Sequence, residues 1–232
     1  DIHFSDEIGE LNQAIKRLKF DEHFFLQLLM ALRKQSLQRS GTSPLSNIGP
    51  YFKLISESLE FELTEAQKKV IKEIHSDLKN SISMNRLLQG DVGSGKTIVS
   101  ILVSALAVGN STQVAIMAPT EILATQHYHS FKTELGRANI PCVLLLGNMK
   151  KSERIPILDG LENGKIPVVI GTHALIQDDV IFKNLGLVIV DEQHRFGVNQ
   201  RAKLIEKGIN PHFLAMTATP IPRTLSITYH GD

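Results

Sequence analysis

The segment Gly90–Thr97 holds the residues whose types and spacing could most directly do chemistry. It reads GDVGSGKT and fits the pattern G-x-x-x-x-G-K-[ST] at every fixed position. Its glycines let the backbone wrap around phosphate oxygens with N–H groups pointing inward, and a helix starting near Gly95 adds the positive end of its dipole. Lys96 would contact the β- and γ-phosphates, and the Thr97 hydroxyl would bind Mg²⁺. We predict a phosphate-binding loop of Gly90, Asp91, Val92, Gly93, Ser94, Gly95, Lys96 and Thr97, the alternative being a glycine-rich turn without a ligand.

The acidic pair Asp191-Glu192 is the second candidate for chemistry, because it follows the apolar run LGLVIV. If that run is a strand, both carboxylates lie at the carboxyl edge of the sheet, where open α/β sheets bind ligands. Asp191 would hold Mg²⁺ through water, and Glu192 would orient or deprotonate the water that attacks a phosphate. The alternative is an ordinary surface pair at a strand end, which the loop at Gly90–Thr97 disfavours. Phosphoryl transfer needs a lysine, a metal and a positioned nucleophile, and the sequence supplies candidates for all three.

The elements that must position these residues alternate between short β-rich runs and helical stretches from Phe61 onward. Apolar runs such as VAIM, VVI and LVIV are typical of strands buried on both faces, which indicates a parallel sheet with helices on each side. The fold class is therefore α/β. We predict strands over Arg86–Gln89, Gln113–Met117, Cys142–Leu146, Pro167–Ile170, Leu187–Val190 and Phe213–Met216. The predicted helices are Glu65–Lys79, Lys96–Val108 and Glu121–Glu134.

The first sixty residues differ from the rest, and we predict a helical linker segment over 1–60 and the main domain over 61–232. Apolar residues at helical spacing give the linker a helix with one apolar stripe, which must dock on another surface. The stripe is Phe24, Phe25, Leu28, Leu29 and Leu32, with Asp21 as the predicted cap. A shorter helix around Ala14, Ile15 and Leu18 would precede it, and RSGTSPLSNIGP would form a loop.

Composition narrows the class of protein. The chain has 232 residues with 42% hydrophobic and 21% charged side chains, which is globular, and its net charge of +1 excludes a polybasic or strongly acidic tail. A single cysteine, Cys142, cannot form an internal disulfide, and no apolar run is long enough for a membrane helix. We expect a cytoplasmic protein. Without a starting Met or a closing element after His230-Gly231-Asp232, we expect a piece of a longer chain.

Five motifs occur in the order found in superfamily 2 DNA helicases: GDVGSGKT, APTEILATQH, GTHALI, DEQHRFGV and TATPIPRTL. From Phe61 to the C-terminus the chain closely resembles this superfamily. DEQH followed by RFGV looks most like the bacterial branch-migration helicases, whereas the transcription-repair coupling translocases share TATPIPRT but typically read DEEH. Gln193 stands at the differing position and favours the former. The resemblance implies a RecA-like P-loop domain, the first motor lobe, that uses ATP and Mg²⁺. The stretch around Arg17–Leu32 also looks like the segment between a wedge domain and the motor.

The same resemblance implies roles for further residues. Leu63-Thr64 with Gln67 looks like the motif whose glutamine reads the adenine edge, and Phe61 would lie against the base. An ordinary exposed helix residue is the alternative for Gln67. The implied catalytic set is Lys96, Asp191, Glu192, Gln193 and His194. Thr97 and Asp191 would be the Mg²⁺ ligands, and His194 would form a hydrogen bond toward Thr217–Thr219.

Three strand-end segments are implied to contact DNA or to couple it to the nucleotide. Their free N–H groups and hydroxyls suit phosphate contacts that carry no sequence information. For two of them, simple N-capping by Thr120 or Thr172 is the alternative. The residues are Pro119, Thr120, Glu121, Gly171, Thr172, His173, Thr217, Ala218 and Thr219.

Other conspicuous residues favour plainer roles. His127 and His129 lack further ligands, so we predict no zinc site. Cys142 lies in an apolar run and is predicted to be a buried small hydrophobe. Lys150, Lys151 and Arg154 form a small basic cluster, which we expect to be a solvated loop face.

The function that these observations predict is the ATP-hydrolysing motor lobe of a DNA translocase that remodels forks and junctions in repair and recombination. The rivals are a coupling translocase motor, a P-loop kinase and a non-hydrolysing ATP-binding module. A GTPase is disfavoured because N-K-x-D is absent. The expected partners are largely sequence-independent DNA, a second RecA-like lobe and a wedge domain, with no membrane. Such motors take an arginine finger from the second lobe, so the fragment alone should be nearly inactive.

Overall fold

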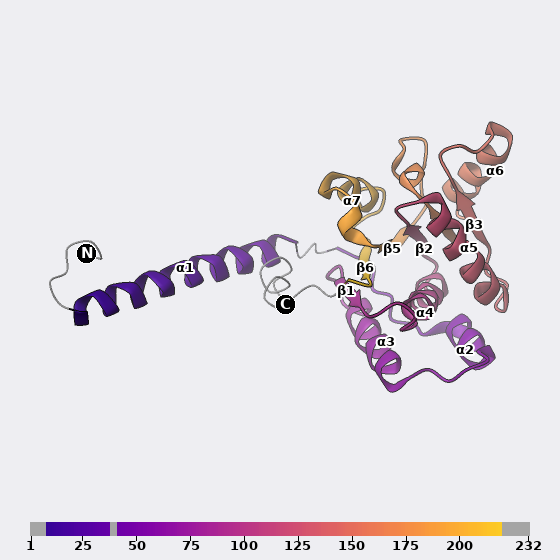
Figure 1. Cartoon of the computed structure of the whole chain (residues 1–232). Coiled ribbons are helices and arrows are strands. Elements are labelled where there is room, and N and C mark those ends of the chain that lie inside the picture. Colours follow the sequence, from indigo (N-terminus) through magenta and orange to yellow (C-terminus); the bar gives the residue numbers. More distant parts are fainter. Residues whose placement is uncertain (1–7, 38–40, 220–232) are drawn as a thin grey trace. The chain divides into compact units, whose positions relative to one another are not determined.

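The computed structural model describes residues 8–37 and 41–219 of the chain (Figure 1). The chain divides into two units: one contains helix α1 (Ile8–Leu37), and the other spans Arg39–Pro220 and contains all the remaining helices and strands. Within the described residues, no helix is long and apolar enough to cross a membrane.

Helix α1 is one uninterrupted element of 30 residues. The prediction of two helices with Asp21 as a cap is wrong, because Asp21 lies inside the helix and pairs with Arg17 one turn earlier. Phe24, Phe25 and Leu29 of the predicted apolar stripe lie on α1 and are 50–65% exposed. The side chain of Leu32 lies outside the described residues.

Six parallel strands form one sheet in the order β1-β6-β5-β2-β4-β3. Each predicted strand is present, with its ends within two residues of the prediction, and the predicted helices α3 (Glu65–Leu78), α4 (Lys96–Gly109) and α5 (Glu121–Gly136) are confirmed. The α/β fold class with a parallel sheet is therefore confirmed. The strands are β1 (Asn85–Gln89), β2 (Gln113–Met117), β3 (Cys142–Leu145), β4 (Val168–Gly171), β5 (Leu185–Asp191) and β6 (His212–Thr217).

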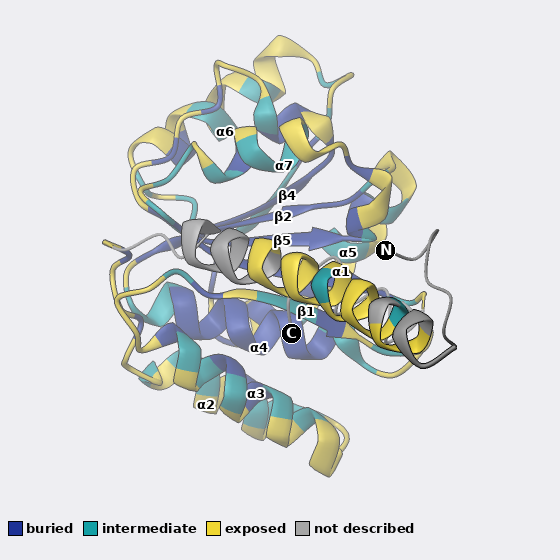
Figure 2. Ribbon diagram, turned by 90° about the vertical axis from the view of Figure 1, so that its left-hand side faces the viewer, coloured by how far each residue is buried: buried dark blue, intermediate teal, exposed yellow. Residues whose placement is uncertain are grey.

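Helices cover both faces of the sheet, because alternate side chains along each strand point to opposite faces. Val114 and Ile116 of β2 belong to the core under α2 (Gly49–Ser58), α3, α4 and α5. Ala115 and Met117 belong to the second core, under α6 (Lys151–Glu162), α7 (Val198–Ile205) and the 3₁₀ helix η1 (His173–Ile176). Helix α4 is apolar all round and is buried along most of its length, as Figure 2 shows.

Three helices of the structure are not predicted from the sequence: α2, α6 and α7. Helix α2 is short, and its Pro50 ends the segment RSGTSPLSNIGP that the sequence predicts as a loop, although proline favours the first turn of a helix. Its Ile55 is fully buried, and α2 packs against α4 in the unit that spans Arg39–Pro220. The division of the parent protein at residue 60 stays a prediction.

Helices α6 and α7 are the other two helices that the sequence did not predict. The structure of α6 also shows that the role expected for Arg154 is wrong. Pro156 lies inside α6, and a proline in a helix interior obscures the helical signal of this segment. Arg154 is not solvated: its guanidinium donates to both carboxylate oxygens of Asp179 at 2.9 Å and to Gln177.

Cys142 is partly buried, and this burial raises the pKa of its thiol to about 12, which agrees with an unreactive packing role.

Candidate functional site

The order of the strands divides the predicted site residues into two groups. All the carboxyl ends of a parallel sheet lie at one edge, so every strand-end motif is at that edge. The strands β1, β6 and β5 are neighbours in the sheet. The segment Gly90–Thr97 follows β1, Thr217–Thr219 lies at the end of β6, and Asp191-Glu192 lies at the end of β5. Pro119–Glu121 follows β2 and Gly171–His173 ends β4, which are the next two strands. The predicted nucleotide residues and most predicted DNA residues thus occupy adjacent halves of one edge.

The loop between β1 and α4 has the backbone that the glycine pattern predicts. Gly93 and Gly95 have φ of +83° and +82°, which other residues adopt only with strain. Gly95 is the N-cap of α4 and provides no side chain to bond the N–H groups of the first turn. The Lys96 ammonium donates to the carbonyl oxygens of Gly90 at 2.6 Å and Asp91 at 2.8 Å. The lysine therefore lies folded over its own loop.

Gln67 joins helix α3 to this loop. Its Oε1 accepts from the Thr64 N–H at 2.9 Å, and its Nε2 donates to the Ser94 carbonyl at 2.9 Å. The Thr64 hydroxyl accepts in turn from the Gln67 N–H, which completes a capping box. A side chain at Gly95 would collide with the Gln67 amide, so the glycine is needed for this approach as well as for its φ. Gln67 is thus a partly buried residue that caps α3 and also bonds the loop.

A cavity of about 710 Å³ lies beside the loop, within the size range of ligand sites in proteins. It brings together Phe61, Gln67, Gly93, Gly95 and Thr97, all predicted from the sequence to hold a nucleotide. Its opposite wall comes from α5, with His129, Ser130, Thr133 and Glu134, which the sequence analysis did not assign. Their helix was predicted, but nothing in the sequence shows that it faces α3 across a cavity.

Glu192 is held in a strained conformation and aimed at the end of β6. Its φ and ψ are 48° and 54°, in the left-handed region that non-glycine residues rarely occupy. One carboxylate oxygen accepts from the Ala218 N–H and the other from the Thr217 hydroxyl, both at 3.1 Å. The prediction that His194 makes this link is wrong: His194 is half exposed and its Nδ1 lies 3.4 Å from Glu192. Backbone strain of this kind is concentrated at functional sites.

Asp191 is buried at the tip of β5 and has a partner that the sequence analysis missed. Oδ2 of its carboxylate lies 2.8 Å from Nε2 of His127, which comes from α5. Gln193 is buried too, and its Oε1 accepts from Arg201 of α7 at 3.1 Å. Neither His127 nor Arg201 could be found from spacing, since 64 and 8 residues separate the partners and the contacts cross between elements.

The segments at the ends of β2 and β4 differ in how their threonine hydroxyls are used. Thr120 caps α5, where its hydroxyl accepts from the Leu123 N–H at 3.2 Å, and Glu121 accepts from Asn148. Thr172 is buried with no side-chain hydrogen bond to the described residues, whereas His173 is exposed. The capping interpretation is therefore correct for Thr120 and not for Thr172.

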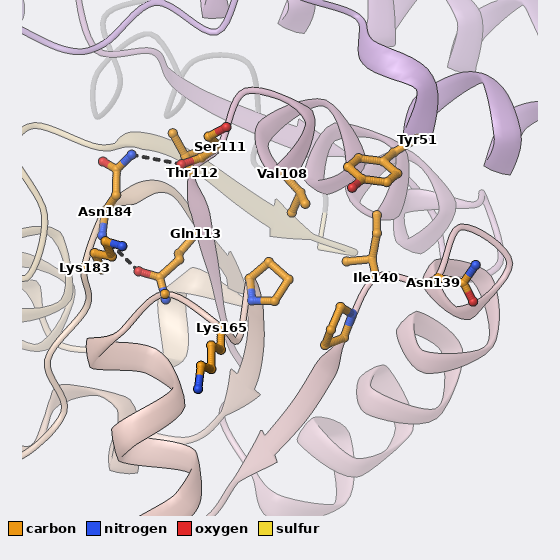
Figure 3. Close-up of a pocket in the computed structure, with 13 residues that line it drawn as sticks. Tyr51, Val108, Ser111, Thr112, Gln113, Asn139, Ile140, Lys165, Lys183 and Asn184 are labelled. Atoms are coloured by element: carbon orange, nitrogen blue, oxygen red, sulfur yellow. Dashed lines mark hydrogen bonds between the residues drawn. The ribbon is translucent and has the colours of Figure 1, made fainter.

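A second hollow lies at the opposite, amino edge of the sheet, with a volume of about 500 Å³ (Figure 3). It is lined by turns that lead into the strands, including Asn139, Lys165, Lys183 and Asn184. It contains none of the predicted site residues.

The comparisons with known proteins agree with this arrangement. Residues 64–227 match the DEAD/DEAH box helicase family, and the chain belongs to that family. Its six-stranded parallel sheet flanked by helices is the RecA-like domain of such helicases. The yeast DEAD-box splicing factor Prp28 shares this fold with a TM-score of 0.59 at 19% identity, over 79% of this chain and 47% of the Prp28 chain.

The most informative similarity is to bacterial RecG. The chain is 48% identical to the ATP-dependent DNA helicase RecG of Synechocystis over its full length and 50% identical to that of Aquifex aeolicus over 94% of its length. A structure of RecG bound to a three-way DNA junction matches 98% of the chain and 31% of its own, with a TM-score of 0.83 and 44% identity. The chain spans 28% of these two curated relatives. The predicted resemblance to a branch-migration helicase is confirmed, and the rival functions are not supported.

Proposed function

We propose that this chain is the ATP-hydrolysing first motor lobe of a DNA translocase. The observation that carries the proposal is the meeting of Gly90–Thr97, Glu192 and Thr217 on three neighbouring strand ends. Lys96 would exchange its two carbonyl partners for the β- and γ-phosphates of ATP. Glu192 would act on the attacking water, and its bonds to Thr217 and Ala218 would report the state of the phosphate to the end of β6.

The chain's own donors fit Mg²⁺. The Thr97 hydroxyl and the Asp191 carboxylate are hard oxygen ligands, and Mg²⁺ is usually held by one or two such groups together with substrate phosphates and water. When bound, the ion would neutralise developing charge on the phosphates. No cluster of three or more His, Cys, Asp or Glu side chains that could hold a metal is found among the described residues. Thr97 would bind the ion through its hydroxyl and Asp191 would hold it through a water molecule, together with phosphate oxygens of the nucleotide.

The proposed partner is DNA, because a RecG relative has been solved on a three-way junction. In this chain the segments Pro119–Glu121 and Gly171–His173 would contact the DNA backbone, next to the nucleotide half of the edge. In the parent protein a second lobe would supply the arginine finger, and a wedge domain would engage the branch. ATP hydrolysis would then drive remodelling of forks and junctions in repair and recombination.

The test is the ATPase rate of the parent protein with branched, duplex and single-stranded DNA at equal nucleotide concentration. We expect the largest stimulation with branched DNA. A rate that is independent of all three DNAs, or transfer of the phosphate to an acceptor other than water, would overturn the proposal.

Gln67→Ala should narrow the preference for ATP over GTP. In the structure the Gln67 amide uses one N–H and one lone pair on Ser94 and Thr64, which leaves one of each for N7 and N6 of adenine. A site built to hydrogen-bond a group discriminates strongly, because a mismatched base leaves buried partners unpaired. Competition binding with ATP and GTP measures the ratio, and equal affinities in the unmutated chain would contradict the assignment.

A further inference from the structure

His127 and Asp191 form a contact that the proposed reaction does not yet use. Nε2 of His127 lies 2.8 Å from Oδ2 of Asp191, and the two side chains are only 12% and 13% exposed. His127 lies on α5, which follows β2, whereas Asp191 ends β5; β2 and β5 are neighbours in the sheet. The pair therefore ties a helix on one face of the sheet to the acidic tip of a strand.

The chemistry of the pair fixes the direction of the hydrogen bond. A carboxylate accepts only, so the imidazole donates from its Nε2–H to Oδ2. A buried carboxylate is costly without a donor, and His127 provides the only side-chain hydrogen bond to Asp191 among the described residues. The bond uses one oxygen and holds the carboxylate in one rotamer. Oδ1 is left for water or for a metal-bound water.

We propose that His127 is the positioning residue of Asp191, which orients this carboxylate for the Mg²⁺–nucleotide complex. This inference rests on the proposed function, because it assigns Asp191 to the metal. His127 itself would touch neither the ion nor the nucleotide. Residues that orient a metal-binding side chain in this way typically change metal affinity by about 10–100-fold when they are removed.

The test is the Mg²⁺ dependence of nucleotide binding, measured with a fluorescent ATP analogue in the full chain. His127→Ala is expected to raise the Mg²⁺ concentration at half-saturation by about tenfold or more. Binding of the analogue without Mg²⁺ should not change, because Gly90–Thr97 and Gln67 are intact. Gln126→Ala is the matched control, since Gln126 is the preceding residue on α5 and is exposed.

Two amide variants separate positioning from packing. The glutamine amide reaches about as far as the imidazole Nε2, whereas the asparagine amide is too short. We therefore expect His127→Gln to restore most of the Mg²⁺ response and His127→Asn to resemble His127→Ala. This comparison also keeps the test decisive if His127→Ala does not fold, because both amide variants keep a polar side chain of moderate size.

The outcomes distinguish this inference from the proposed function. If the unmutated chain binds no nucleotide with or without Mg²⁺, the proposed function fails. If it binds with a clear Mg²⁺ response that His127→Ala and His127→Asn leave unchanged, only the positioning role fails. A lower melting temperature with an unaltered Mg²⁺ response would show that the pair is purely structural. Equal losses with and without Mg²⁺ would also overturn the inference, since His127 would then act on the nucleotide site as a whole.

Discussion

Lys96→Ala is expected to lower the ATP turnover of the parent protein by about 100-fold or more. The ammonium lies over the loop on the carbonyl oxygens of Gly90 and Asp91, within reach of any phosphate bound there. Removing one donor from a transition state that develops negative charge typically costs about 10²–10³ in rate. The measurement is steady-state phosphate release with saturating DNA.

The matched control for this variant is Lys165→Ala. Lys165 is exposed and lines the hollow at the amino edge, on the side of the sheet away from the loop (Figure 3). Like Lys96→Ala, the Lys165→Ala substitution removes one positive charge. Comparing the two variants therefore separates the loss of the Lys96 side chain from the change in net charge. Normal ATP turnover in Lys96→Ala, with Lys165→Ala equally normal, would refute the assignment of Gly90–Thr97 as the phosphate-binding loop.

Glu192→Gln should separate ATP binding from ATP hydrolysis. The glutamine keeps the shape of the side chain and an oxygen for the Ala218 N–H, but it cannot act as a base. We expect ATP affinity to be retained while turnover falls by about 10²–10⁴, the usual contribution of a general base. Equilibrium binding and single-turnover hydrolysis, measured on the same preparation, give the two quantities.

Asp191→Asn is the companion variant, and it should fail differently. Loss of the charge weakens the proposed Mg²⁺ ligand, so nucleotide binding in the presence of Mg²⁺ should decrease together with turnover. If the two variants lost affinity equally and kept the same rate, the division of roles between Asp191 and Glu192 would be wrong. Thermal unfolding of both proteins checks that neither change acts through stability.

Local sequence was sufficient for most of the fold. The strands β2, β4 and β5 are continuous apolar runs, and such runs are buried on both faces whichever strands lie beside them. The helices α3, α4 and α5 also begin where the sequence marks a start: Thr64 and Thr120 cap two of them, and Gly95 precedes the third. The helices that escaped prediction, α2, α6 and α7, are short, and α2 and α6 contain a proline.

The sequence by itself determined the chemical groups of the candidate site. The glycine spacing favours the backbone of Gly90–Thr97, because residues other than glycine adopt φ near +80°, as at Gly93 and Gly95, only with strain. An apolar strand that ends in Asp191-Glu192 likewise carries its carboxylates to the edge of the sheet. These features depend on the residues themselves and their immediate neighbours, and for that reason they could be read without a structure.

Only the tertiary structure decided which of these groups meet. The strand order places β6 between β1 and β5, so that the first and last motifs of the chain become neighbours. It also brings His127 to Asp191, Arg201 to Gln193, and the Thr217 hydroxyl to Glu192 in place of His194. Each of these contacts depends on how buried faces of separate elements pack. Packing is set by the complementarity of whole surfaces, which the spacing of residues along the chain does not encode locally.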